Sequence, residues 1–268
     1  MLKGIFSSWS YLIWYAFYFL LFSLITAGFI IPFYILFLFL AFLPLSEQLW
    51  RWATGIRPLR LMAEKERLNP IFQDVYNAYS YAVYAKEGKI THAQNLKLYI
   101  QETMNINAFA FGRETLVLTK GSIDLLDDEA LKGLIAHEIA HFHNHDTTGA
   151  LFSYVANFPI SILMKKLRKI NSTLEDGFIR FFFNIIYGFF RAIEFLGDLI
   201  LMHHSRKREY KADMFALKFG YGKELAEVLI QLYQISMEKP QTIGEMMRAT
   251  HPPITKRIER LEVTLYSE

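Results

Sequence analysis

The sequence from residue 127 to residue 146 reads DDEALKGLIAHEIAHFHNHD, and His137, Glu138 and His141 form a His-Glu-x-x-His motif within it. Asp127 is suited to cap a helix, and the two acidic residues that follow suit a first helical turn. Apolar residues recur at helical spacing through the stretch. We therefore expect one amphipathic helix that carries the motif and buries one of its sides.

On such a helix the two histidines lie one above the other, because residues four apart share a face. Their imidazole groups can then both bind one tetrahedral Zn²⁺. Glu138 is rotated by about 100° from its neighbour, so its carboxylate can miss the metal and still reach a water molecule. The motif predicts a zinc site with a general base beside it, and two incidental surface histidines are the alternative.

The composition excludes several other kinds of site. The chain has 268 residues, of which 53% are hydrophobic, and it has no cysteine. A disulfide framework and a thiolate zinc site are therefore excluded, which leaves histidine and carboxylate ligands. The formal net charge of +3 is too small to indicate nucleic acid as a partner. A chain of this length forms one or two domains with a buried core.

The amino-terminal part contains a long uncharged block, since no charged residue occurs between Lys3 and Glu47. About 20 apolar residues cross a bilayer once, so the block is long enough for two crossings. The segment from Trp50 to Arg67 is aromatic and basic, which is typical of the cytoplasmic side of a membrane. We expect a transmembrane hairpin over residues 1–46 with both of its ends in the cytoplasm.

Local patterns predict a helix and a small sheet ahead of the motif. Asn69 and Pro70 can open a helix that ends at Gly88. We expect an antiparallel sheet whose outer strand can bind an extended peptide through backbone hydrogen bonds. A sheet that only packs is an equally supported alternative. Three short runs predict the strands: 96–100, 106–111 and 115–119.

A second hydrophobic region follows the motif. Residues 147–164 and 178–202 are long enough to span a membrane, although the second segment carries four charged residues. The basic loop from Lys165 to Lys169 lies between them, and a hairpin parallel to the first would place it outside, against the positive-inside tendency. Two transmembrane helices are expected, with long amphipathic helices at the membrane interface as the alternative.

A third metal ligand must come from a carboxylate, because position ten after His137 is Thr147 and not a histidine. We prefer Glu209, which would share one face of a predicted polar helix with Asp213, four residues on. Glu209 would bind zinc, and Asp213 would hold a ligand histidine through its other ring nitrogen. A solvated charged helix is the alternative. The carboxylates considered are Asp146, Glu194, Asp198, Glu209 and Asp213.

Taken in order, these motifs resemble the HtpX branch of the integral-membrane zinc metallopeptidases, a family that also includes the CAAX prenyl proteases. His-Glu-Ile-Ala-His is followed by a hydrophobic pair, by Ser-Arg-x-x-Glu-Tyr-x-Ala-Asp at 205–213 and by Thr-His-Pro-Pro at 250–253. Asn-Ala-Phe-Ala at 107–110, Thr-Lys-Gly at 119–121 and Asp146 also match. The resemblance covers nearly the whole chain, whose amino-terminal hairpin is shorter and more aromatic than in the usual bacterial member.

The resemblance implies a mainly α membrane protein with transmembrane helices and a gluzincin-type α+β catalytic domain that contains a small antiparallel sheet. We expect the hairpin over 1–46, the two parts of the catalytic domain over 47–146 and 203–268, and the second hydrophobic pair over 147–202. The implied cofactor is one Zn²⁺ per chain. The residues it assigns are His137, His141 and Glu209 for zinc, Glu138, His251 and Arg257 for catalysis, and Asn107, Ala108 and Phe109 for substrate binding.

The expected function is that of a zinc endopeptidase in the inner (plasma) membrane. It would cut membrane or misfolded proteins at the cytoplasmic face, as a quality-control enzyme does, and its partners would be the protein substrate and the lipid bilayer. A selective protease for lipidated or small peptides is the first alternative. An inactive membrane scaffold that keeps zinc is the second, and the presence of Glu138 argues against it, since a structural site has no use for a base.

Overall fold

The computed structural model describes residues 39, 43–88, 95–147, 165–166, 168–173, 177–237 and 252–267. The expected hairpin over 1–46 lies almost wholly outside these residues, and so do most of 147–164 and the predicted catalytic residue His251. In the part of the chain that is described, no helix combines the length and the apolar character that crossing a membrane requires.

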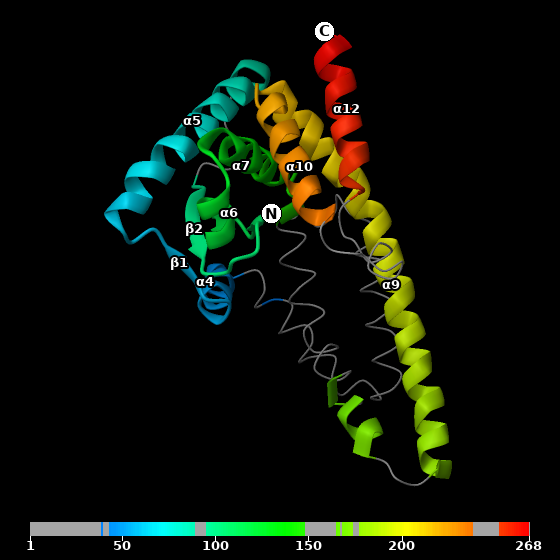
Figure 1. Ribbon diagram of the computed structural model, residues 1–268. Helices are drawn as coiled ribbons and strands as arrows, with labels where there is room; N and C mark the ends of the chain where they lie inside the picture. The colour runs from blue at the N-terminus through cyan, green and yellow to red at the C-terminus, as the bar shows by residue number, and fades with distance from the viewer. Residues whose placement is uncertain are drawn as a thin grey trace.

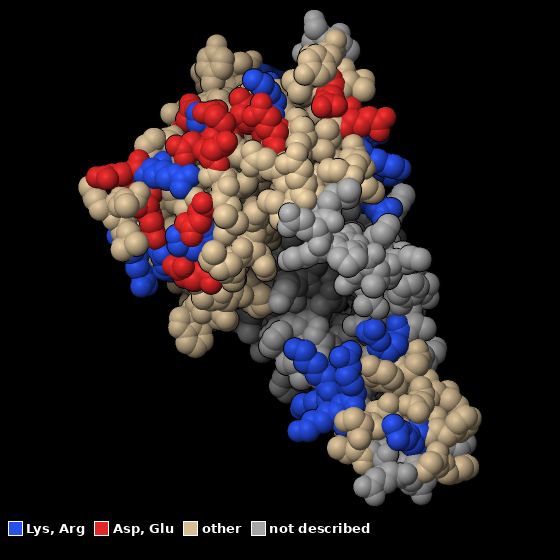
Figure 2. Space-filling model, in the orientation of Figure 1, with Lys and Arg blue, Asp and Glu red and all other residues tan. Residues whose placement is uncertain are grey.

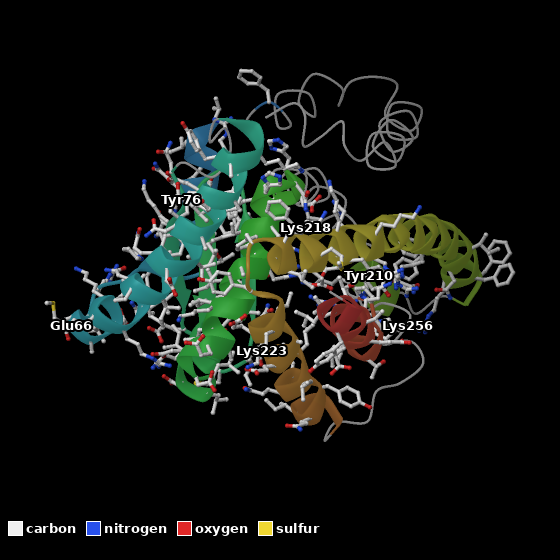
Figure 3. The ribbon with its side chains drawn as sticks, turned by 90° about the horizontal axis from the view of Figure 1, so that it is seen from above. Glu66, Tyr76, Tyr210, Lys218, Lys223 and Lys256 are labelled. Atoms are coloured by element: carbon white, nitrogen blue, oxygen red, sulfur yellow. The ribbon has the colours of Figure 1, made fainter. Side chains whose placement is uncertain are left out.

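Helix α7 (Asp128–His143) lies at the centre of the helical part of the structure (Figures 1 and 3). It packs against α5 (Met62–Glu87), α9 (Gly177–Lys218) and α10 (Gly222–Met237). Helix α12 (Ile254–Ser267) covers α10 and α9, while α4 (Pro44–Ala53) contacts the sheet, and the short α6 (Lys120–Leu125) follows it. The helix that carries the motif is therefore surrounded by elements from both halves of the chain.

The predicted start of α7 is confirmed, but the expectation of an amphipathic helix with one buried side is wrong. The Asp127 carboxylate accepts a hydrogen bond of 2.8 Å from the backbone N–H of Ala130, which caps the helix. Every residue from Gly133 to Ala140 is buried, so all sides of this part of the helix are covered. Gly133 lets α10 approach closely, because a Cβ atom there would lie 2.4 Å from the carbonyl carbon of Glu224. The position of α7 therefore depends on packing on several sides.

The sheet has four strands in the order β1-β2-β4-β3. The expected antiparallel pairing is confirmed for β3 and β4, which form a hairpin, but the prediction of a wholly antiparallel sheet is wrong, since β2 runs parallel to β4. After β2 the chain skips one strand position before it forms β3, and β4 then returns into the gap. The strand bounds are β1 Ile56–Pro58, β2 Lys97–Gln101, β3 Ala108–Phe111 and β4 Thr115–Thr119.

Helix α5 begins at Met62, so the predicted start at the Asn-Pro pair is wrong and that pair lies inside the helix. The Glu64 carboxylate accepts from the backbone N–H of Leu61 at 3.2 Å and so satisfies a donor at the helix start. Arg57 of β1 binds the same carboxylate at 2.6 Å and 3.0 Å, and this pairing lowers the pKa of Glu64 to about 2. The predicted end at Gly88, with φ of +68°, is confirmed.

Helix α9 is continuous over 42 residues, about 63 Å at 1.5 Å per residue. The expected hydrophobic segment 178–202 and the expected polar helix after it are therefore one element, and the proposed domain boundary at residue 203 falls inside it. Figure 2 shows Lys and Arg gathered near the amino-terminal end of α9, the end that lies away from α7. It also shows Asp and Glu gathered over α5 and α7. The exposed basic residues at that end include Lys165, Lys166, Lys169 and Arg180.

Candidate metal centre

Helices α7 and α9 bring three possible metal ligands together. His137 and His141 of α7 and Glu209 of α9 each present a ligand atom, and these atoms lie within 4.8 Å of one another. Figure 3 labels Tyr210, the residue after Glu209, on the stretch of α9 that lies beside α7. All three side chains are at least half-buried. The two predicted histidines and the preferred carboxylate thus converge, although 68 residues separate His141 from Glu209 in sequence.

The spacing of these three donors fits a tetrahedral metal ion. The Nε2 atoms of His137 and His141 are 3.1 Å apart, and each lies 3.3 Å from a carboxylate oxygen of Glu209. Zinc–ligand distances near 2.0–2.2 Å at tetrahedral angles require donors about 3.3 Å apart. His137 Nε2 faces Glu209 Oε2 and His141 Nε2 faces Glu209 Oε1, so the two imidazoles and the carboxylate can occupy three corners of one tetrahedron. Among the described residues no fourth ligand joins these three.

Each ligand histidine has a carboxylate at its other ring nitrogen. Asp213 Oδ1 lies 2.9 Å from His137 Nδ1, and Asp146 Oδ2 lies 3.0 Å from His141 Nδ1. A carboxylate at Nδ1 favours the tautomer that carries its hydrogen there, so both Nε2 lone pairs point toward the position of the metal. Asp213 makes the contact that the sequence predicts for it.

Asp146 reaches His141 through a turn that follows α7. His145 has a φ of +63°, a left-handed conformation that few residues other than glycine adopt but in which histidine is enriched. Its backbone N–H donates to the carbonyl of Phe142 at 3.0 Å and closes the turn. The chain then folds back, and Asp146 faces the last turn of the helix. Sequence reasoning considered Asp146 as a ligand, but this turn places it against a ligand instead.

Arg257 of α12 is buried beside the three donors. Its guanidinium group makes two hydrogen bonds to Asp213, of 2.9 Å and 2.6 Å, and its Nη1 lies 3.5 Å from Glu209 Oε2. Bidentate pairs of this kind fix geometry as well as charge. Arg257 therefore ties α12 to the two acidic residues of α9 that stand at the metal position.

The buried centre holds more acid than base. With neutral imidazoles, two negative charges are in excess, and buried charge without a counter-charge is costly. One divalent cation neutralises them, so donor spacing and charge both fit Zn²⁺. Four carboxylates face two guanidinium groups: Glu138, Asp146, Glu209 and Asp213 against Arg208 and Arg257.

The electrostatics of the site favour protonation of the two histidines. Burial opposes a positive charge on His137, and Arg257 does so too, but the carboxylates of Asp213 and Glu209 outweigh both and raise its pKa. Burial also opposes protonation of His141, where Asp146 and Glu209 raise the pKa well above the usual value. The same acidic residues that attract a metal ion therefore also attract protons.

We expect zinc affinity to fall steeply as the pH is lowered. Because both pKa values are raised, the imidazoles are protonated below them, and zinc must displace these protons. Where both are protonated, affinity should fall by roughly 100-fold per pH unit, and proton release should persist above pH 6.5, the ordinary pKa of histidine. Isothermal titration in buffers of different ionisation enthalpy measures the released protons. Zinc binding without proton release at pH 7 would contradict these raised pKa values.

The predicted substrate residues lie at the start of β3. The backbone N–H and C=O of Asn107 both bond the Ser122 hydroxyl at 2.7 Å, which fixes the entry to the strand. Ala108 is buried, and Phe109 is half-buried with its ring 6.2 Å from that of Phe111. Strand β3 is the edge of the described sheet and packs beside α7.

These features define a class of protein. Two histidines of a His-Glu-x-x-His helix and one carboxylate from a later helix could hold a metal ion, and this set of ligands is typical of zinc metallopeptidases. The family model described as Peptidase family M48 matches residues 74–265, so the chain belongs to peptidase family M48, whose metallopeptidases use zinc.

The similar curated proteins include several called Protease HtpX homolog. The one from Dictyoglomus turgidum is 30% identical over 203 residues, covering 62% of this chain and 63% of that protein. The one from Bacillus subtilis is 29% identical over 185 residues, covering 61% of each. The match thus spans less than two thirds of the length of these relatives. It supports the predicted resemblance to the HtpX branch.

The fold is similar to that in the crystal structure of Ste24p from S. mikatae. The TM-score is 0.50 at 21% sequence identity, and the match covers 92% of this chain and 57% of the other. At this identity the similarity concerns the fold. The architecture is therefore a helical M48 fold with a small mixed sheet, as the described elements show.

Proposed function

We propose that this chain is a zinc endopeptidase that hydrolyses peptide bonds of membrane or misfolded proteins. The observation that carries the proposal is the convergence of His137, His141 and Glu209: the two Nε2 atoms are 3.1 Å apart, and each lies 3.3 Å from a different carboxylate oxygen of Glu209. The buried Glu138 lies next to one of these ligands in sequence, on the same helix. A site that only stabilised the fold would more often be closed by four protein ligands.

In the proposed reaction the chain supplies a base and an ordered set of ligands. His137, His141 and Glu209 would hold a zinc ion, which would supply polarisation of the scissile carbonyl and a lowering of the pKa of water toward about 7. The Glu138 carboxylate accepts a proton from the attacking water and later donates it to the leaving amine. Asp213 and Asp146 hold the two imidazoles in one tautomer, and no covalent intermediate with the protein is needed.

Two further residues have proposed roles beside the base. The family resemblance assigns both His251 and Arg257 to the active site. The contacts of Arg257 with Asp213 and Glu209 favour a role in holding these carboxylates. Stabilisation of the oxyanion is then the role proposed for His251.

The substrate would bind as an extended strand. Strand β3 has β4 on one side and is the sheet edge in the described part of the chain, and such an edge can pair with a peptide through backbone hydrogen bonds. Asn107, Ala108 and Phe109 would contact the peptide near the zinc. The packing of β3 beside α7 supports this placement.

The proposed location is the inner membrane, with the site on the cytoplasmic side. The support comes from the uncharged sequence between Lys3 and Glu47 and from the basic segment after it. Helix α4, at the end of that uncharged block, exposes the apolar side chains of Leu45, Leu49 and Trp52. Exposed apolar groups beside basic ones suit the interface of a lipid bilayer.

The proposal is tested with the full chain in detergent, with zinc supplied. Unfolded casein should be cleaved, a chelator should reduce cleavage to background, and added zinc should restore it. A prenylated peptide offered in parallel separates the two peptidase alternatives, since preference for it would indicate the selective enzyme. Stoichiometric zinc with no cleavage of any peptide would indicate the inactive scaffold and would overturn the proposal.

A further inference from the structure

Glu47 is the first charged residue after the uncharged block, and it is buried. It lies on α4, and only 5% of its surface is exposed. A glutamate that only marked the end of a membrane segment would face water. Burial of a carboxylate is costly unless hydrogen bonds compensate for the lost hydration. Its partners therefore indicate what it does.

The Glu47 carboxylate binds the turn between β3 and β4. It accepts hydrogen bonds from the backbone N–H groups of Arg113 at 3.0 Å and Glu114 at 3.2 Å, and from the Thr115 hydroxyl at 2.5 Å. Arg51, one helical turn later, donates to the same hydroxyl at 2.7 Å and lies 3.6 Å from the carboxylate. Helix α4 thus holds the hairpin through a charge-assisted network.

The turn is held from its other side by the segment that follows α7. The backbone N–H of Gly112 donates to the Thr147 carbonyl at 3.2 Å, and the Thr147 hydroxyl donates to the Gly112 carbonyl at 2.9 Å. Gly112 has a φ of +67°, and a Cβ atom there would lie 2.4 Å from the Glu47 carboxylate. Conformation and space therefore both require glycine where the two contacts meet.

These contacts join the hairpin to the metal centre over a short path. Thr147 directly follows Asp146, which holds the ligand His141. The other end of β3 is fixed by the bonds between Asn107 and Ser122 described above. Strand β3 is therefore fixed at both ends, and the contacts at the end that leads into the turn include those of Glu47.

We propose that Glu47 is a positioning residue. It fixes the position of strand β3 relative to the residues that would bind zinc. This inference rests on the proposed function, since it takes β3 to be the strand that pairs with the substrate. It makes α4, at the end of the uncharged block, part of the machinery that aligns a peptide. Displacement of a reacting group by about 1 Å can lower a rate by about 100-fold, so a small shift of β3 is enough.

The test replaces Glu47 by glutamine in the full chain. An amide has one acceptor oxygen, and its NH₂ group faces backbone donors, so at least one bond to the turn is lost. We expect kcat/KM for a peptide of about ten residues to fall roughly 10- to 100-fold, with zinc content unchanged. A blocked dipeptide, which has few backbone groups to pair with β3, should lose less than about 3-fold. Hydrogen exchange at the amides of Arg113 and Glu114 should accelerate.

Two further variants make the result specific. Gly112→Ala pushes a methyl group against the carboxylate and should show the same substrate-length dependence. Glu227→Gln on α10 removes an exposed carboxylate that pairs only with Lys223 among the described contacts, and it should change neither substrate. If wild-type protein cleaves no peptide, the proposed function fails. If it does cleave, and Glu47→Gln leaves both substrates unchanged or lowers both equally with loss of zinc, the positioning role is wrong.

Discussion

Glu138→Gln should retain one zinc per chain and lose cleavage by about 100- to 10,000-fold, the range that a general base contributes. The amide has nearly the shape of the carboxylate and cannot accept a proton from water. The ligands His137 and His141 keep their partners Asp213 and Asp146, so metal affinity should stay close to that of the wild type. Zinc content by atomic absorption and the rate on casein are the two measurements.

Glu129→Gln is the matched control, because Glu129 lies on the same helix and 58% of its side chain is exposed. It should keep both zinc and rate. Normal cleavage by Glu138→Gln would end the assignment of the base. Joint loss of zinc and activity would show that Glu138 acts on the metal site itself.

The parts of the centre that follow from spacing along one helix could be predicted from sequence. Residues four apart share a face, which placed His137 with His141 and Glu209 with Asp213. The cap at Asp127 and the helix end at Gly88 have equally local causes. In each case the residues that determine the feature lie within about two helical turns of one another.

The features of the structure that depend on contacts between distant parts of the chain could not be predicted from the sequence. Spacing could not place Asp146 against His141, because that contact requires the left-handed turn at His145. The sheet order was missed because β4 pairs with both β2 and β3. An alternating sequence pattern predicts a strand, but it does not indicate which other strand pairs with it. Nothing local distinguishes Glu47 from an ordinary membrane-flanking charge, since its burial arises from a hairpin about 65 residues later. The start of α5 was misplaced because the Asn-Pro pair resembles a helix opening, although Glu64 already caps the true start.

Glu209→Ala should abolish stoichiometric zinc binding, and cleavage should be lost with it. Removal of a group that only orients a ligand typically lowers metal affinity by 10- to 100-fold, so loss of a ligand should exceed that range. In the variant only the two histidines remain as ligands. Their Nε2 atoms, 3.1 Å apart, would occupy two of the four coordination positions of the ion. The measurement is zinc affinity by competition with a chromophoric chelator.

Asp213→Asn provides the comparison that gives this result its meaning. Asp213 is four residues away on the same helix and contacts His137 Nδ1 at 2.9 Å, so its loss should weaken zinc binding only within the 10- to 100-fold range. Glu209→Gln, which preserves volume, separates lost ligation from a collapsed site, because it too should bind zinc more weakly than Asp213→Asn does. If Glu209→Ala bound zinc as tightly as the wild type while Asp213→Asn did not, the third ligand would be Asp213, and His137 would have to bind the metal through Nδ1, the ring nitrogen that faces Asp213.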